Sequence, residues 1–172
     1  MKHVFVNLAV FKVAWTAVVV SAAAGVPVIG AIAVAIAVGI HLWSSDNPDA
    51  EIRLLLVAAT MGLAWESALV LAGLLEYSSG TLMPGLAPYW IVAMWILFAT
   101  TLNSGMRWLR RSTAIAAVAG AIGGPLAFFA GASIGAVELA SPVIALISIG
   151  IGWAVMLPFL VKLAIRLDDS QR

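Results

Sequence analysis

The sequence predicts an all-α membrane protein in which six transmembrane helices form a single domain over residues 1–172. Three observations support this fold class. The chain is 63% hydrophobic and only 10% charged, so it has too few polar side chains to coat a water-soluble domain. Six apolar segments follow one another, each near the length of about 20 residues that crosses a hydrocarbon core. Basic residues occur almost only in alternate connections between these segments.

The first two segments, 4–24 and 27–43, are predicted to form a helical hairpin. The first is longer than the apolar part of a signal peptide and contains Asn7 and Lys12, so we interpret it as a retained helix. The connection that begins at Gly25 is short enough to require a tight antiparallel turn.

The third segment, 53–75, follows a polar connection, and the fourth, 88–103, follows a longer loop. Asp49 is the expected N-cap of the third helix, with Glu51 in its first turn. The loop over 76–88 is rich in glycine, proline and serine, which predicts irregular structure near the membrane interface.

The fifth segment, 113–133, and the sixth, 142–164, complete the bundle. Pro142 suits the first turn of a helix, and Ser141 suits the N-cap position before it. Glu138, in the loop between these segments, is expected to be a solvated charge or a cap for the sixth helix.

The basic residues predict that both termini lie in the cytoplasm. With the N-terminus inside, eight of the nine basic residues fall on the cytoplasmic side, and the ninth, Lys12, lies within the first helix. The eight are Lys2, Arg53, Arg107, Arg110, Arg111, Lys162, Arg166 and Arg172. Aromatic residues at predicted helix ends are interpreted as interfacial belts; they are Trp43, Trp90, Trp108, Tyr77 and Tyr89.

The fifth helix carries two glycine pairs with a spacing of four residues: Gly120 with Gly124, and Gly131 with Gly135. Small residues at this spacing let helix backbones approach closely, so we predict a packing face that could also bind a second copy or a membrane partner. Pro125 removes one amide donor and is expected to kink the helix, with the freed carbonyl either covered by neighbouring helices or lining a cavity.

Five polar residues lie within the predicted spans and form a candidate binding cluster facing the cytoplasm: Asn7, Lys12, His41, Glu66 and Asn103. At a rise of 1.5 Å per residue, Lys12 lies about 12 Å from the cytoplasmic end and Glu66 about 18–20 Å from it. An ionisable side chain at that depth is costly, so Glu66 is expected to face the bundle interior.

Two interpretations of Glu66 and of Lys12 stay open. Glu66 either binds a proton or cation, or is a hydrogen-bonded acid that ties helices together. Lys12 either pairs with Glu66, which offsets part of the desolvation of each, or extends its side chain to the interface alone.

Several classes of protein are excluded or disfavoured by composition and motifs. A net charge of +1 and the lack of an aromatic-interleaved basic run argue against nucleic-acid binding. Without cysteine there is no disulfide, thiolate metal site or thiol nucleophile. The histidines, His3 and His41, have no ligand-type partner four residues away, and no catalytic signature is present, so we predict no metal, no cofactor and no enzyme activity that can be assigned.

Three stretches give the chain a resemblance to a known family. They are Ala87-Pro88-Tyr89-Trp90, then Leu97 to Asn103 with Arg107-Trp108-Leu109, and Gly123 to Ala127. Along most of its length the chain resembles a family of small bacterial inner-membrane proteins, domain of unknown function family 2878. The resemblance implies a bacterial inner-membrane protein and nothing about catalysis. Lys12 and Glu66 depart from the family pattern, which implies that a pairing between them would be particular to this member.

Three functions are consistent with these features. The first is an accessory or scaffold membrane protein, which would use the fifth helix to dock a partner or a second copy. The second is a small permease or proton- or ion-coupled carrier that uses Glu66 and Lys12. The third is a membrane-embedded enzyme acting on lipid, with Glu66 as general base, although no nucleophile or metal site accompanies it.

Overall fold

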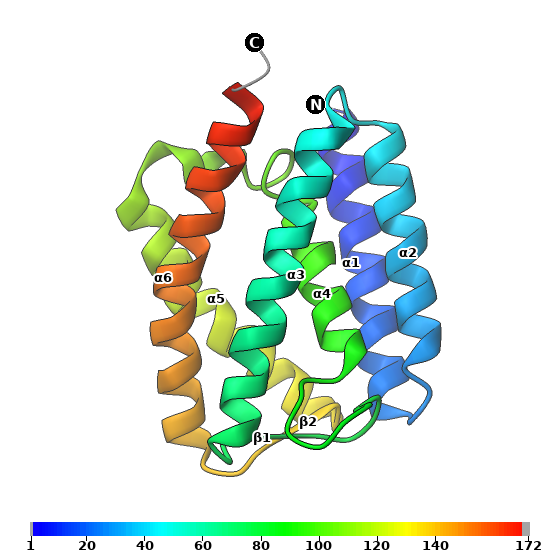
Figure 1. Cartoon of the computed structure of the whole chain (residues 1–172), viewed down its shortest axis with the longest axis vertical. Coiled ribbons are helices and arrows are strands. Elements are labelled where there is room, and N and C mark those ends of the chain that lie inside the picture. The colour runs from blue at the N-terminus through cyan, green and yellow to red at the C-terminus, as the bar shows by residue number, and fades with distance from the viewer. Residues whose placement is uncertain (1, 170–172) are drawn as a thin grey trace.

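The protein is a bundle of α-helices in the computed structural model, which describes residues 2–169 and the side chains of residues 5–168. The described chain contains six α-helices: α1 (Lys2–Ala23), α2 (Val28–Trp43), α3 (Pro48–Leu71), α4 (Tyr89–Ala99), α5 (Thr113–Ile134) and α6 (Pro142–Asp169). Three short elements join them: β1 (Leu75–Tyr77), the 3-10 helix η1 (Arg107–Arg111) and β2 (Val137–Leu139). The helices run side by side, with the start of α1 and the end of α6 at the same end of the bundle (Figure 1). All six predicted helical segments are therefore confirmed as helices.

Four helices are long and apolar enough to cross a membrane, as judged by length and composition. These candidate spans are Phe5–Ala23, Pro48–Leu71, Thr113–Ile134 and Pro142–Asp168. The other two apolar helices are shorter, because 16 residues of α2 and 11 of α4 extend only about 24 Å and about 17 Å. The chain is a multi-pass membrane protein on the strength of the four long helices.

The third helix begins earlier than the sequence predicted. Asn47, rather than Asp49, is the N-cap, and its side-chain oxygen accepts a hydrogen bond from the amide of Ala50 at 3.2 Å. Pro48 then fills the first helical position, where its missing amide donor costs nothing. Asp49 and Glu51 lie in the first turn, where carboxylates complement the positive end of the helix dipole.

The fourth helix ends at Ala99, four residues before the predicted end at 103. The hydroxyls of Thr100 and Thr101 donate to the carbonyls three residues earlier, at 2.7 and 2.6 Å. Such side-chain bonds compete with continued helix, and the backbone tightens into turns after this point. Because α4 packs among α1, α2 and α3, its irregular C-terminal segment is covered by protein where Thr100, Thr101 and Leu102 are buried.

The connections at the other end of the bundle contain a small sheet that the sequence did not predict. Strand β1 pairs antiparallel with β2, with Leu75 opposite Leu139 and Glu76 opposite Glu138. The sheet joins the α3–α4 connection to the α5–α6 connection (Figure 1). Glu138 is exposed within β2, and Pro142 begins α6 as predicted.

Tryptophans lie against glycines where helices α3 to α6 meet. A Cβ at Gly62 would lie 2.3 Å from the Trp95 ring, and one at Gly152 would lie 2.2 Å from the Trp65 ring. Each ring therefore fills space that only a glycine on the neighbouring helix provides.

The predicted interfacial aromatic residues separate into two groups. Trp43 and Trp108 are 90% and 48% exposed, consistent with an interfacial position. Trp90 is instead 2% exposed and donates its indole N–H to the carbonyl of Ser79 at 2.9 Å. Tyr77 also turns into the protein, where its ring meets Trp90 edge to face at 5.4 Å between centroids. Helix-end position alone therefore did not distinguish a belt residue from a core residue.

Candidate functional site

Glu66 is a buried acid held by two donors from outside its own helix. The residue is 0% exposed in the middle of α3, as predicted for an acid facing the bundle interior. Its Oε2 accepts a hydrogen bond from the Tyr77 hydroxyl at 2.7 Å, and its Oε1 accepts one from Trp95 Nε1 at 3.0 Å. Both oxygens are thus satisfied, and the carboxyl group ties α3 to β1 and α4.

The proton in the contact with Tyr77 belongs to the tyrosine. Burial raises the pKa of Tyr77 well above its ordinary value, and the charge of Glu66 and the hydrogen bond to it raise it further. Tyr77 therefore stays a neutral donor at physiological pH.

A wall of aromatic rings separates Glu66 from the surface of the bundle. Trp95 stacks on Trp153 of α6 with 4.6 Å between ring centroids, and Phe98 meets Trp153 edge to face at 5.1 Å. Trp95 is 2% exposed, so one face of this wall covers the acid. The other face borders a groove.

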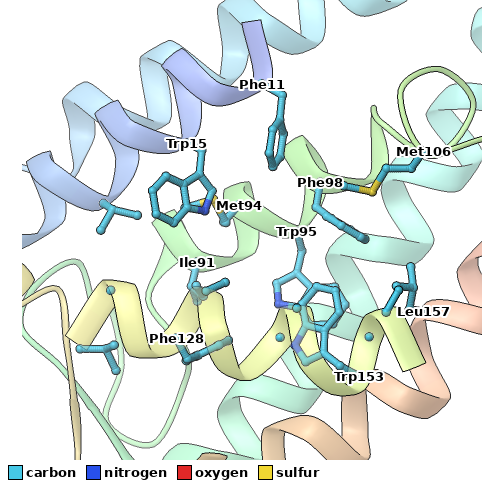
Figure 2. Close-up of a pocket in the computed structure, with 18 of the residues that line it drawn as sticks. Phe11, Trp15, Ile91, Met94, Trp95, Phe98, Met106, Phe128, Trp153 and Leu157 are labelled. Carbon is cyan, nitrogen blue, oxygen red and sulfur yellow. The ribbon is translucent and has the colours of Figure 1, made fainter. Parts of the chain in front are cut away.

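The groove lies between α1 and α5, with α4 as its floor (Figure 2). It is partly open, and its volume is about 370 Å³, within the range of about 300–1,000 Å³ typical of small-molecule sites. Phe11 and Trp15 project from α1, Met94 and Phe98 from α4, and Phe128 from α5 (Figure 2). Tyr77 and Trp95, the two donors to Glu66, also line it.

Small residues on α5 create the open volume. Gly123 lines the groove, and a Cβ added there would meet no atom within 4 Å. Gly131 and Ala127 line it too, and a Cβ at Gly131 would meet only Val137, at an ordinary 3.6 Å. These positions leave space rather than bring two helices together.

Only the first predicted glycine pair packs helix against helix. A Cβ at Gly120 would lie 2.2 Å from the Trp153 carbonyl oxygen, and one at Gly124 would lie 2.5 Å from the Trp153 ring. This face is therefore occupied by α6 of the same chain. Gly135 instead ends α5 in the left-handed conformation, with φ +87°.

Pro125 does not interrupt α5, which continues from Thr113 to Ile134. The carbonyl of Ala121, which loses its helical donor to the proline, faces Gly150 of α6, where an added Cβ would lie 3.1 Å from the oxygen. The carbonyl is thus covered by a neighbouring helix, which is the simpler of the two predicted alternatives.

Lys12 lies at the groove and not at Glu66. Its Nζ is 5.0 Å from the centroid of the Trp15 ring, a cation–π contact on the same helix. Lys12 is exposed, and the ion pairs found within residues 5–168 do not include it. Among the side chains of residues 5–168, it is the one charged group that lines the groove.

A second polar assembly, here called the end network, joins the helices near the start of α3. Glu51 accepts a hydrogen bond from Asn103 Nδ2 at 2.7 Å, and its other oxygen lies 3.0 Å from His41 Nε2. Arg110 donates to Asn103 Oδ1 and pairs with Asp168 at 3.2 Å. The end network therefore links α2, α3, η1 and α6.

The five predicted cluster residues thus occupy separate places. His41 and Asn103 meet through Glu51, which lies 15 residues and about 22 Å along α3 from Glu66. Asn7 donates to the carbonyl of Thr100 at 3.3 Å, and Lys12 borders the groove. The side chains of Lys2 and His3, and Arg172, lie outside the described residues.

Sequence reasoning missed Tyr77, Trp95, Glu51, Arg110 and Asp168 as members of these assemblies. Glu51 was interpreted only as a first-turn charge, and Tyr77 only as an interfacial aromatic. A signal existed for Trp95, because a buried indole N–H needs an acceptor and Glu66 was the deepest acid available. Among the described residues, no group of three His, Asp or Glu side chains could hold a metal ion.

Comparison with known proteins adds a family but no activity. Residues 4–159 match the family described as Protein of unknown function (DUF2878). No curated protein and no solved structure matches the chain. The match spans most of the sequence, and the chain belongs to this family of proteins of unknown function.

Proposed function

We propose that this protein crosses the bacterial cytoplasmic membrane six times, with both termini in the cytoplasm. Six helices alternate in direction, and the start of α1 and the end of α6 lie at one end of the bundle. The basic residues Arg53, Arg107, Arg110, Arg111, Lys162 and Arg166 belong to elements that begin or end there. Their concentration on one side supports a cytoplasmic location for that side. Reporter fusions at each terminus and in the 76–88 loop test this orientation.

We further propose that the protein is a lipid-binding accessory protein of that membrane, with the groove between α1 and α5 holding the hydrocarbon chain of a bilayer lipid. The groove is the observation that carries this proposal. Its volume is about 370 Å³, and apart from Lys12 its lining residues are uncharged and mostly apolar or aromatic. In a membrane protein such a groove borders the acyl chains of the bilayer. A lipid is therefore the most abundant molecule that can enter it.

The geometry favours this function over the two alternatives. A carrier built on Glu66 and Lys12 needs both groups at one site, whereas Lys12 borders the groove and Glu66 lies behind Trp95 and Tyr77. An enzyme with Glu66 as general base needs its carboxyl group within reach of the substrate. A chain in the groove would instead meet the aromatic wall.

Binding of a second copy or another membrane protein through α5 is a separate proposal. Gly120 and Gly124 already contact α6, so such a partner would meet the opposite side of α5. That side presents an exposed apolar stripe consisting of Val118, Ile122, Leu126 and Phe129. Disulfide cross-linking between single cysteines introduced on this stripe tests the proposal, because the native chain contains no cysteine.

Lipid binding can be tested with a variant in which an added side chain fills the groove. In Gly123→Phe the added Cβ has no neighbour within 4 Å, and because Gly123 lines the groove we expect the ring to occupy it. Gly39→Phe is the matched control, because Gly39 is an exposed α2 glycine that also has no neighbour within 4 Å and does not line the groove. The measurement is the number of lipids retained per protein after mild detergent extraction, by native mass spectrometry.

Wild type and Gly39→Phe should retain a lipid that Gly123→Phe loses, with all three proteins eluting as the same folded species. Retention of lipid by Gly123→Phe at the wild-type level would contradict the proposed function. So would a wild-type protein that retains none.

A further inference from the structure

We propose that the lipid held in the groove is an anionic phospholipid, with its phosphate at the end formed by Lys12 and η1 and its chain directed toward β1 and β2. This inference rests on the proposed function and names the lipid class and its direction. It follows from the unequal charges at the two ends of the groove.

Lys12 supplies a cation inside the groove. Its ammonium group is exposed, contacts the Trp15 ring and has no carboxylate partner among the described residues. Among the α1 residues that line the groove, Phe11 and Lys12 lie nearest the start of the helix, which is at the same end of the bundle as η1, whereas Trp15 and Val19 lie farther from it. A lysine in that position can reach a phosphate near the interface.

Helix η1 adds further cations at the same end, here called the basic end. Met106, Trp108 and Leu109 line the groove there. Next to them Arg107 and Arg111 are exposed and have no acidic partner in the described chain, whereas Arg110 turns inward to Asp168.

The opposite end, here called the acidic end, offers the headgroup no basic residue, because residues 72–88 and 135–141 contain neither lysine nor arginine. Tyr77 and Val137 line the groove there, and each belongs to a strand of the small sheet. Glu76 and Glu138 are exposed and directly opposite each other in that sheet. Because side chains alternate faces along a strand, Glu76 and Glu138 lie on the other face of the sheet from Tyr77 and Val137, so they make this end of the bundle negative without entering the groove. The basic end instead offers a lysine inside the groove and arginines beside it.

Competition between two lipids tests the inference. The full chain is reconstituted in vesicles of equimolar phosphatidylglycerol and phosphatidylcholine with identical acyl chains, then extracted in mild detergent. Mass spectrometry gives the ratio of the two lipids retained per protein, after subtraction of the Gly123→Phe background. One cation near the headgroup is worth about fivefold in affinity, so we expect phosphatidylglycerol to be enriched by at least that factor.

Two double variants test whether the basic end causes the preference for the anionic lipid. Lys12→Gln with Arg107→Gln should lower the enrichment by at least about fivefold while the protein still retains lipid. Lys162→Gln with Arg166→Gln removes the same charge from exposed positions on α6 outside the groove, and should leave the enrichment unchanged.

Three results would overturn the inference while the proposed function stands. The wild type could retain both lipids in equal amounts, or the Lys12 and Arg107 changes could leave the enrichment unaffected. The third is that the α6 control loses as much enrichment as the Lys12 and Arg107 variant. Failure of wild type to retain either lipid above the Gly123→Phe background would instead overturn the proposed function itself. The two failures are therefore distinguishable.

Discussion

The Tyr77 hydroxyl donates a 2.7 Å hydrogen bond to Glu66, eleven residues earlier in the chain, and thereby fastens β1 to the middle of α3. Trp95 holds the other carboxylate oxygen from α4. Because Tyr77 and Trp95 also line the groove, Glu66 is a positioning residue for the groove wall.

Tyr77→Phe should destabilise the protein by about 1–3 kcal/mol, because a buried carboxylate oxygen loses its donor. Tyr89→Phe is the control, since Tyr89 is partly buried and its hydroxyl makes none of the hydrogen bonds seen in the described chain. Thermal unfolding of the wild type and the two variants in the same detergent measures both changes in stability. Equal effects of the two changes would show that the contact with Glu66 contributes nothing.

Alkaline pH should unfold the protein in a manner that depends on Tyr77. Its pKa is raised well above about 10 in the folded state, so the neutral hydroxyl is favoured by folding. The resulting stability is fully present below about pH 10 and is lost as pH rises through the folded-state pKa. Tyrosinate absorbance followed together with unfolding should show Tyr77 ionising only as the fold is lost, and Tyr77→Phe should lack this component. Ionisation of Tyr77 near pH 10 in the intact fold would refute the expectation.

The two glycine pairs of α5 should respond differently to alanine. Gly120→Ala places a methyl group against the Trp153 carbonyl and should destabilise the protein by about 1–3 kcal/mol. Gly131→Ala meets only an ordinary contact with Val137 and should be neutral or stabilise the protein by up to about 1 kcal/mol, as alanine favours helix. Comparison of the two unfolding curves is the test. A tolerated Gly120→Ala would contradict the close packing of α5 on α6.

Arg110→Ala should lower the free energy of unfolding by about 1–2 kcal/mol, because Asn103 and Asp168 in the end network both lose a hydrogen-bond donor. The neighbouring Arg111 is exposed and pairs with no acid in the described chain. The free energy of unfolding of Arg111→Ala should therefore lie within about 0.5 kcal/mol of the wild-type value. Both free energies can be measured by denaturant titration. A larger loss for Arg111→Ala would invert the assignment of the two arginines.

The helices were predictable because their signals are local. Apolar runs located all six, and Pro142 begins α6 as predicted, whereas Gly135, predicted as a packing glycine, ends α5. The end of α4 was missed because two threonines turn the backbone through side-chain hydrogen bonds, which hydropathy does not register.

The candidate site was predictable only in part because its contacts are distant in sequence. The burial of Glu66 follows from its place in an apolar span, and the structure confirms it. Its partners depend on β1 pairing with β2, about 60 residues later, and on α4 packing against α3, which no local pattern encodes. Counting depth along separate helices placed Lys12 and Glu66 near each other but ignored the direction in which each side chain faces.

Photolabelling with a phospholipid that carries a photoreactive group on its acyl chain tests the central claim most directly. Peptide mapping should find the label on groove residues such as Ile91, Met94 and Phe128, and Gly123→Phe should abolish it while Gly39→Phe does not. Labelling confined to outward residues such as Val118 and Ile122, and equal in wild type and Gly123→Phe, would contradict a lipid site between α1 and α5.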